Sequence, residues 1–314
     1  MDEEKISDNT VLPAYSGIPT FMRQPVSRRL DGIDVAVVGV PFDSGATSFR
    51  SGARFGPRKI REASLLLWGY NRYFEIAPLE VLNVVDYGDV AVEPASLEAT
   101  VGLISSEVAK VLDTGSTVIA LGGDHSIALP LLRAHAAKFG PLALVQFDAH
   151  VDTEQDRLDH GTPFRHAVNE GLINTKAWLQ AGIRGPVSYP QEVEEARQLG
   201  AHVLDIDECF EMGIPHVIKS IRERIGSHPT YVSLDIDAVD PAYAPGTGTP
   251  EIGGFTSYQI LQLLRGLRGL NLVGFDLVEV SPPYDHSEIT SILAANLVFE
   301  FLCLLAVRTA EKSV

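Results

Sequence analysis

Three apolar segments of the chain, residues 117–121, 142–147 and 231–234, each run into a cluster of acidic and imidazole side chains. The polar groups that follow them are Asp124 and His125, then Asp148, His150 and Asp152, and then Asp235 and Asp237. Several ionisable groups beside buried strands are costly unless something neutralises them. A bound metal ion would do so, and metal-assisted chemistry is therefore the first hypothesis.

Spacing within two of these clusters supports a shared site. In an extended chain alternate residues point to the same face, so Asp148, His150 and Asp152 are expected to point the same way. The same argument applies to Asp235 and Asp237. A solvated loop is the competing explanation for the first of these segments.

The segment around His125 is ambiguous when taken alone. Gly122 and Gly123 permit a tight turn that would project His125 over the end of the sheet. An ordinary helix start, with Asp124 as its N-cap and His125 incidental, explains the same residues equally well.

The combined ligand chemistry favours two ions. The candidate ligands contain no cysteine and comprise His125, Asp148, His150, Asp152, Asp235 and Asp237. Carboxylates with some imidazole suit Mn²⁺ and similar ions better than a structural zinc. Two ions about 3.5–4 Å apart, bridged by shared carboxylates, would use all six groups and activate water for hydrolysis. A calcium loop is excluded, because Thr153 and Asp240 occupy its glycine position and Asp159 and Gly246 its glutamate position.

Apolar runs alternate with helical periodicity along the chain, which predicts a parallel sheet covered on both faces. The expected strands are 35–40, 81–85, 117–121, 142–147, 177–183, 202–204, 231–234 and 272–277. The expected helices are 57–67, 96–112, 127–138, 190–199, 215–225 and 257–267. The prediction is a three-layer α/β/α fold with eight parallel strands, in one catalytic domain (31–314) after an N-terminal arm (1–30). Ligands of such sheets bind beyond the carboxyl ends of the strands, where the Asp and His clusters lie.

Composition narrows the partners. The chain has 314 residues, with 41 acidic against 25 basic side chains and a formal net charge of −16. This charge argues against nucleic acid or an anionic membrane as partner and allows a cationic substrate. Cys209 and Cys303 form no disulfide framework, the N-terminus has no signal-peptide pattern, and residues 292–307 are expected to form a buried helix. A cytoplasmic location is therefore expected.

Longer motifs resemble the ureohydrolase family, which contains the arginases and agmatinases. The resemblance covers nearly the whole chain and is strongest to the agmatinase, guanidinobutyrase and proclavaminate amidinohydrolase branch. The motifs are G-G-D-H-S (122–126), D-A-H-V-D (148–152), S-L-D-I-D-A-V-D-P (233–241), H-G-T-P-F-R (160–165) and V-E-V-S-P-P-Y-D (278–285).

This resemblance implies a role for each candidate residue. His125, Asp148, Asp152 and Asp235 would hold one ion, and His150, Asp148, Asp235 and Asp237 the other. The ions would be Mn²⁺ by family default, with Ni²⁺ or Co²⁺ as alternatives. Asp152 would also orient the attacking nucleophile, His160 would relay a proton to the leaving amine, Glu279 would pair with the guanidinium, and Thr249 would lie near it. Arg165 is a candidate contact for a substrate carboxylate, although a structural ion pair is favoured.

The implied reaction releases urea and an amine from a guanidino compound. Segments with which arginases bind the amino-acid end of arginine have no counterpart in 153–159 and 185–188, so L-arginine is disfavoured and agmatine or 4-guanidinobutyrate is favoured. The short loop between Asp152 and His160 leaves a small or N-substituted guanidine, such as guanidine or a biguanide, as an alternative. Family analogy suggests a homo-trimer or homo-hexamer.

Three other classes of protein share part of this residue pattern. An Asp-nucleophile phosphatase would use Asp235 and leave His125, Asp148 and His150 without a role. Single-zinc deacetylase relatives of the same fold lack part of the ligand set. A silent subunit that supports an active paralogue in a hetero-oligomer is the non-enzymatic alternative.

Overall fold

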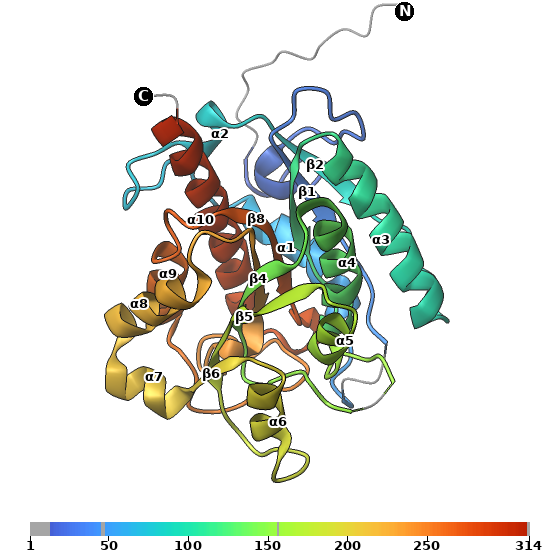
Figure 1. Ribbon diagram of the computed structural model, residues 1–314. Coiled ribbons are helices and arrows are strands. Elements are labelled where there is room, and N and C mark those ends of the chain that lie inside the picture. Colours follow the sequence, from blue (N-terminus) through green and yellow to red (C-terminus); the bar gives the residue numbers. More distant parts are fainter. Residues whose placement is uncertain (1–12, 45–47, 156, 313–314) are drawn as a thin grey trace, which may run out of the picture.

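The computed structural model describes residues 13–44, 48–155 and 157–312, and within them an eight-stranded sheet forms the centre of the molecule (Figure 1). All neighbouring strands are parallel, in the order β2-β1-β3-β8-β7-β4-β5-β6. The strands are β1 (Val35–Gly39), β2 (Val84–Asp89), β3 (Thr117–Leu121), β4 (Leu142–Phe147), β5 (Ile173–Ile183), β6 (His202–Asp205), β7 (Thr230–Asp235) and β8 (Leu272–Val278).

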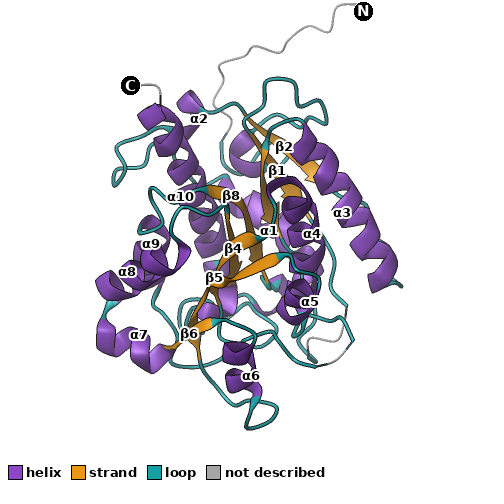
Figure 2. Cartoon of the chain, in the orientation of Figure 1, coloured by secondary structure: helices purple, strands orange, loops and turns teal. Residues whose placement is uncertain are grey.

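Helices cover both faces of this sheet, as Figure 2 shows. They are α1 (Gly56–Ser64), α2 (Pro78–Val81), α3 (Leu97–Asp113), α4 (Ala128–Phe139), α5 (Pro163–Asn169), α6 (Glu192–Gln198), α7 (Ile206–Met212), α8 (Ile214–Ile225), α9 (Ser257–Arg265) and α10 (Ile289–Lys312). Alternate strand residues feed two separate apolar cores. One core joins the sheet to α3, α4, α5 and α6, and the other joins it to α1, α7, α8, α9 and α10. The predicted three-layer fold is confirmed.

Strand boundaries follow the sequence prediction closely, with two larger shifts. Strand β5 begins at Ile173, four residues before the predicted start at 177. The predicted strands 117–121 and 142–147 match β3 and β4. The predicted strand 81–85 is wrong at its start, because Pro78 opens the short helix α2 and the strand begins only at Val84. Helices α5 and α7 were not predicted. Both are only seven residues long, which is too short for a clear helical period.

Strand order decides which loops meet. Strands β3, β8, β7 and β4 are consecutive in the sheet although they are far apart in sequence. The loops after β3, β7 and β4 carry the predicted metal ligands, and Glu279 follows β8 directly. Because all these strands run in one direction, their carboxyl ends bring the four loops to one edge of the sheet.

The glycine pair after β3 is required by close packing. A side chain at Gly123 would lie 1.6 Å from the carbonyl oxygen of Phe42, and one at Gly122 would lie 2.8 Å from the carbonyl oxygen of Leu277. Neither glycine has a positive φ. Glycine is therefore needed at these two positions because neighbouring backbone approaches to within van der Waals distance, and not for the tight turn that the sequence suggested.

Helix α10 is long and apolar enough to cross a membrane by length and composition alone, but 83% of its most apolar window is buried in the fold. Its one interior acidic residue, Glu300, accepts hydrogen bonds from Arg265 and Asn71. This packing confirms the predicted buried helix.

The N-terminal segment is attached to the sheet through Phe21 and residues 25–27, which form backbone hydrogen bonds with Asp86. Phe21 is fully buried, and its backbone N–H donates to the Asp86 carboxylate. Residues 1–12 of the predicted arm lie outside the described residues, so the boundary between arm and catalytic domain stays a prediction.

His135 of α4 is a buried titratable group away from the strand ends. Its Nδ1 bonds to the carbonyl oxygen of Leu131 at 2.7 Å, its ring packs edge-on against Tyr231, and its Nε2 has no hydrogen-bond partner. Burial, reinforced by the charge of Lys138, lowers the pKa of His135 to about 4 even though the Leu131 bond opposes the shift. The folded protein therefore keeps this imidazole neutral where the unfolded chain accepts a proton.

We expect this difference to appear in the pH dependence of stability. Between pH 6.5 and 4 the unfolded state binds the extra proton, so the contribution is complete above pH 6.5 and is lost as the pH falls. His135→Asn should reduce the loss of unfolding free energy between pH 7 and 4.5 by on the order of 2 kcal/mol, measured by chemical denaturation. The exposed His216→Asn serves as control. An unaltered pH dependence in His135→Asn would contradict the prediction.

Candidate active site

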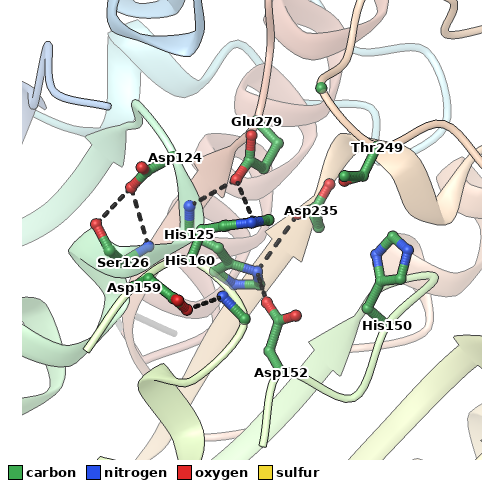
Figure 3. A network of polar contacts seen from close by, with 12 residues as sticks. Asp124, His125, Ser126, His150, Asp152, Asp159, His160, Asp235, Thr249 and Glu279 are labelled. Atoms are coloured by element: carbon green, nitrogen blue, oxygen red, sulfur yellow. Dashed lines mark hydrogen bonds and ion pairs between the residues drawn. The ribbon is translucent and has the colours of Figure 1, made fainter. Parts of the chain in front are cut away.

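His125 lies at the centre of the converging loops, on the 3-10 turn His125–Ile127 that follows β3. It is fully buried, and its Nδ1 lies 2.7 Å from Asp152 Oδ2, 3.2 Å from Asp148 Oδ2 and 3.4 Å from Asp235 Oδ2. Figure 3 shows the ring between Asp152 and Asp235. Despite this crowding, Nδ1 makes no hydrogen bond of acceptable geometry. A buried nitrogen that faces three carboxylates without bonding to them is suited to coordinate a cation.

The two explanations that the sequence left open for Asp124 and His125, a helix N-cap and a site residue, hold together. The Asp124 side chain accepts a hydrogen bond from the Ser126 backbone N–H at 3.1 Å and so caps the turn. It also accepts the backbone N–H of Ser44 at 2.6 Å. The N-cap is therefore real, and it positions His125 toward the site.

A second group of candidate ligands adjoins the first. His150 Nδ1 lies 3.1 Å from Asp237 Oδ2 and 3.7 Å from Asp148 Oδ1. One ligand atom from each of Asp148, His150 and Asp237 lies within 4.8 Å of the others, and the same holds for His125, Asp148 and Asp152. Asp148 belongs to both groups.

The backbone brings these ligands together differently from the prediction. The expectation of extended chain through Asp152 is wrong, because β4 ends at Phe147 and Asp152 has a φ of +49°. Likewise, Asp237 lies on the 3-10 turn Ile236–Ala238, and its N–H donates to Asp235 at 2.8 Å. Local turns, not the alternation of a strand, make these carboxylates converge.

The pKa shifts within the cluster indicate an environment that favours a bound cation. Burial and then the charge of Asp148 raise the pKa of Asp152 to about 7, and burial with the charge of Asp237 raises that of Asp235 well above its usual range. Burial would lower the pKa of His125, but the neighbouring Asp148 and Asp152 carboxylates outweigh burial and raise the pKa instead. Four nearly buried carboxylates faced by two imidazoles carry excess negative charge, which divalent cations would neutralise. The residues present therefore fit a metal site.

His160 and Glu279 form a pair beside the candidate ligands (Figure 3). His160 Nδ1 lies 3.5 Å from Glu279 Oε1, which also accepts the His125 backbone N–H at 2.9 Å. Glu279 is buried with a φ of +62°, a costly backbone conformation that is typical of functional sites. Its second oxygen, Oε2, is buried without a hydrogen-bond partner.

The protonation of this pair follows from its contacts. Burial alone would lower the pKa of His160, but the bond and charge of Glu279 outweigh burial and raise it to about 9. Burial raises the pKa of Glu279, although the contact with His160 opposes the shift. The imidazole therefore holds its proton at neutral pH.

Two further predicted residues have different surroundings. Thr249 Oγ1 donates to Asp237 Oδ2 at 3.3 Å, which places its hydroxyl beside the metal ligands. The Arg165 guanidinium bonds to Glu195 and to the Thr153 carbonyl oxygen, at 2.7 and 2.5 Å. Arg165 thus has the structural ion pair that the sequence favoured, and its contact with a substrate stays a prediction.

A cavity of about 280 Å³ opens over these residues. Its lining consists of His150, Asp152, Glu154, Asp159, His160, Gly161, Pro186, Ser188, Glu192 and Thr249. Trp68 is not part of this lining and is exposed.

Sequence reasoning missed a row of polar residues beneath the metal ligands. Gln180, Gln146, Ser233 and Asp276 lie side by side in register on β5, β4, β7 and β8, and all four are fully buried. Ser233 Oγ lies 2.8 Å from His125 Nε2 and donates to Asp276 at 2.7 Å. An Nε2–H donated to Ser233 leaves the Nδ1 lone pair of His125 free for a metal. The available signal was a lone polar residue in each apolar strand.

The other half of this row orients Asp148. Gln146 donates to Asp148 Oδ2 at 2.9 Å, and Gln180 donates to Gln146 Oε1 at 2.7 Å. Arg184, also missed, connects two site loops by donating to the carbonyl oxygens of Asp237 and Glu251, at 2.7 and 2.6 Å.

Asp276→Asn should weaken metal binding by about 10–100-fold, because Asn at this position no longer supplies the charged acceptor that fixes Ser233 and the His125 tautomer. Equilibrium titration with Mn²⁺ measures the effect. Tyr231→Phe, which removes only the hydroxyl donated to the other oxygen of Asp276, is the matched control and should have a smaller effect. Equal Mn²⁺ affinity in Asp276→Asn and the unmodified protein would refute this role.

Comparisons with known proteins agree with this geometry. The arginase family model matches residues 33–304. The chain is 45% identical to a guanidinobutyrase of Pseudomonas aeruginosa, with 94% of each protein covered, and 45% identical to an agmatinase of Gallus gallus, with 92% of the chain and 86% of the relative covered. The solved structure of proclavaminate amidinohydrolase from Streptomyces clavuligerus matches with a TM-score of 0.90 at 44% identity, covering 94% of this chain and 99% of that one. The resemblance inferred from the motifs is confirmed, and the chain belongs to the arginase family.

Proposed function

We propose that this metal-dependent amidinohydrolase cleaves a guanidino compound to urea and an amine. Agmatine and guanidino acids such as 4-guanidinobutyrate are the favoured substrates, and L-arginine is disfavoured. The observation that carries this proposal is the unpartnered Oε2 of Glu279, buried next to the candidate metal ligands. A guanidinium group presents paired N–H donors in one plane, which suits a fixed carboxylate.

Two ions would be held by the six candidate ligands. His125, Asp148, Asp152 and Asp235 would bind one, and His150, Asp148, Asp235 and Asp237 the other, with Mn²⁺ the expected metal and Ni²⁺ or Co²⁺ as alternatives. These ions would supply Lewis-acid activation of water for hydrolysis. Support comes from the two ligand groups that share Asp148.

The remaining site residues bind and orient the substrate. Glu279 pairs with the guanidinium and aligns its central carbon with the metal ligands, and Thr249 offers a hydroxyl next to Asp237. His160, which keeps its proton at neutral pH, donates it to the departing amine nitrogen. Asp152, whose Oδ2 lies 2.7 Å from His125 Nδ1, would accept a hydrogen bond from the attacking water.

Assembly and location belong to the same proposal. The assembly proposed is a homo-trimer or homo-hexamer, and exposed aromatic side chains on the described surface, including Trp68 and Tyr70, offer contact area for subunits. The proposed location is the cytoplasm. A hetero-oligomer in which this chain supports a paralogue is the alternative.

Urea release from a panel of guanidines tests the function. The purified chain loaded with Mn²⁺ is expected to release urea from agmatine or 4-guanidinobutyrate much faster than from L-arginine. Guanidine and a biguanide belong in the panel, because preferential turnover of either would identify the small-guanidine alternative. Parallel loading with Ni²⁺ and Co²⁺ identifies the metal. No urea from any substrate with any of the three metals would overturn the proposal and favour the supporting subunit.

Glu279→Gln should separate substrate binding from metal binding. We expect kcat/KM to fall by about 100-fold or more, because an amide cannot pair with a guanidinium as a carboxylate does. Bound metal, measured by elemental analysis, should be retained. Asp235→Ala is the opposite case: it removes a proposed bridging ligand and should lose both metal and activity. Loss of metal from Glu279→Gln equal to that from Asp235→Ala would contradict these separate roles.

A further inference from the structure

The outer wall of the active-site cavity is acidic. Glu154, Asp159 and Glu192 line it, in addition to the candidate metal ligand Asp152 at its inner end. No lysine or arginine is among the lining residues that the structure describes. This wall is distinct from the metal ligands, and the proposed chemistry at the guanidinium does not use it.

Ser188 and Gly161 hold the three carboxylates of this wall in place. The Ser188 backbone N–H donates to Glu192 at 2.7 Å, and its hydroxyl donates to Glu154 at 2.9 Å. On the other side, a side chain built at Gly161 would lie 3.6 Å from Glu154 Oε2 and 3.7 Å from Asp159 Oδ1. Glu154 is thus the middle member, with Glu192 on one side and Asp159 on the other.

These acids carry no counter-ion within the described part of the chain. None of the three takes part in an ion pair there, whereas the neighbouring Glu195 pairs with Arg165. Glu192 is only 7% exposed, and burial together with the charge of Glu154 raises its pKa. Neighbouring carboxylates without a cation repel one another, so their placement in a cavity favours a cationic guest.

Glu279 contacts the lining residue His160 at the inner end of the cavity. Its Oε1 lies 3.5 Å from His160 Nδ1, and its buried Oε2, to which the guanidinium is assigned, has no hydrogen-bond partner. A substrate held there by its guanidinium would extend its far end toward the outer wall. A carboxylate at that end would meet like charge, whereas an ammonium or a second guanidinium would meet partners.

We propose that Glu154, Asp159 and Glu192 form a subsite for a second cationic group, so that the preferred substrates are guanidines whose far end is positively charged. This inference rests on the proposed function and narrows it. It assigns the guanidino acids, to which several relatives owe their names, to the disfavoured class for this chain.

Three guanidines of similar length and different end charge test the subsite. Agmatine has a cationic end, butylguanidine a neutral one and 4-guanidinobutyrate an anionic one. With the metal-loaded enzyme we expect kcat/KM to decrease in that order, with at least about tenfold between agmatine and butylguanidine. The difference between agmatine and 4-guanidinobutyrate should shrink at high salt, since the wall is partly open to solvent.

Variants that remove one negative charge identify which acids cause the preference for a cationic substrate end. Glu192→Gln and Glu154→Gln should each lower the ratio of kcat/KM for agmatine to that for butylguanidine by about tenfold, mainly through KM. Glu194→Gln, an exposed position on the same helix, is the matched control and should leave the ratio unaltered. Glu154→Lys should raise turnover of 4-guanidinobutyrate relative to agmatine.

The outcomes separate the subsite from the function. Urea release from butylguanidine with equal or better turnover of 4-guanidinobutyrate than of agmatine would overturn the subsite and leave the hydrolase standing. An unaltered agmatine ratio in both Glu→Gln variants would also overturn it. No urea from any of the three compounds would instead count against the proposed function.

Discussion

Excess negative charge in a buried place is the constraint on which this structure depends. Asp148, Asp152, Asp235 and Asp237 lie at one edge of the sheet with 6% exposure or less, and the imidazoles of His125 and His150 face them. Such a cluster is unfavourable in the bare fold, and divalent cations would relieve the repulsion. Metal binding would thereby recover part of this cost as affinity.

Beneath the cluster lies a support of buried, hydrogen-bonded side chains. A row of buried polar side chains crosses four adjacent strands, and its hydrogen bonds set the direction of His125 at one end and Asp148 at the other. The row lies inside the sheet, where the ladder of backbone hydrogen bonds fixes each strand against its neighbours. Arg184 adds a connection between the Asp237 turn and the loop of Glu251. The candidate ligands are thereby oriented in the absence of a metal.

Substrate selection is a property of the loops above this support. Glu279 and His160 would recognise the guanidinium that all substrates of the reaction share. The end of the substrate that differs would be recognised by three acids from the segments that follow β4 and β5, namely Glu154, Asp159 and Glu192. This division explains how one sheet can carry a constant chemistry while loops change the substrate.

Much of the fold and the ligand set followed from the sequence alone. Near-continuous apolar runs alternating with helical periodicity determine a parallel three-layer sheet, and Asp and His after β3, β4 and β7 identify six candidate ligands by their types. Local patterns could not show why the ligands converge, because Asp152 and Asp237 reach the site through turns that strand alternation does not describe. Nor could they show the pairing of Arg165 with Glu195, or the polar row, whose members are up to 130 positions apart in sequence (146 to 276).

Only the tertiary structure decided which segments of the chain lie next to one another. The order β3-β8-β7-β4 puts Glu279 between loops that are distant in the chain, and the fold around Ser188 and Gly161 gathers three acids into one wall. The physical reason is that residue type and periodicity report how each segment meets its own surroundings, buried or exposed. Which segments surround one another is determined by the packing of the whole chain. That packing sets the distances between charged and hydrogen-bonding groups, and their interaction energies depend on those distances.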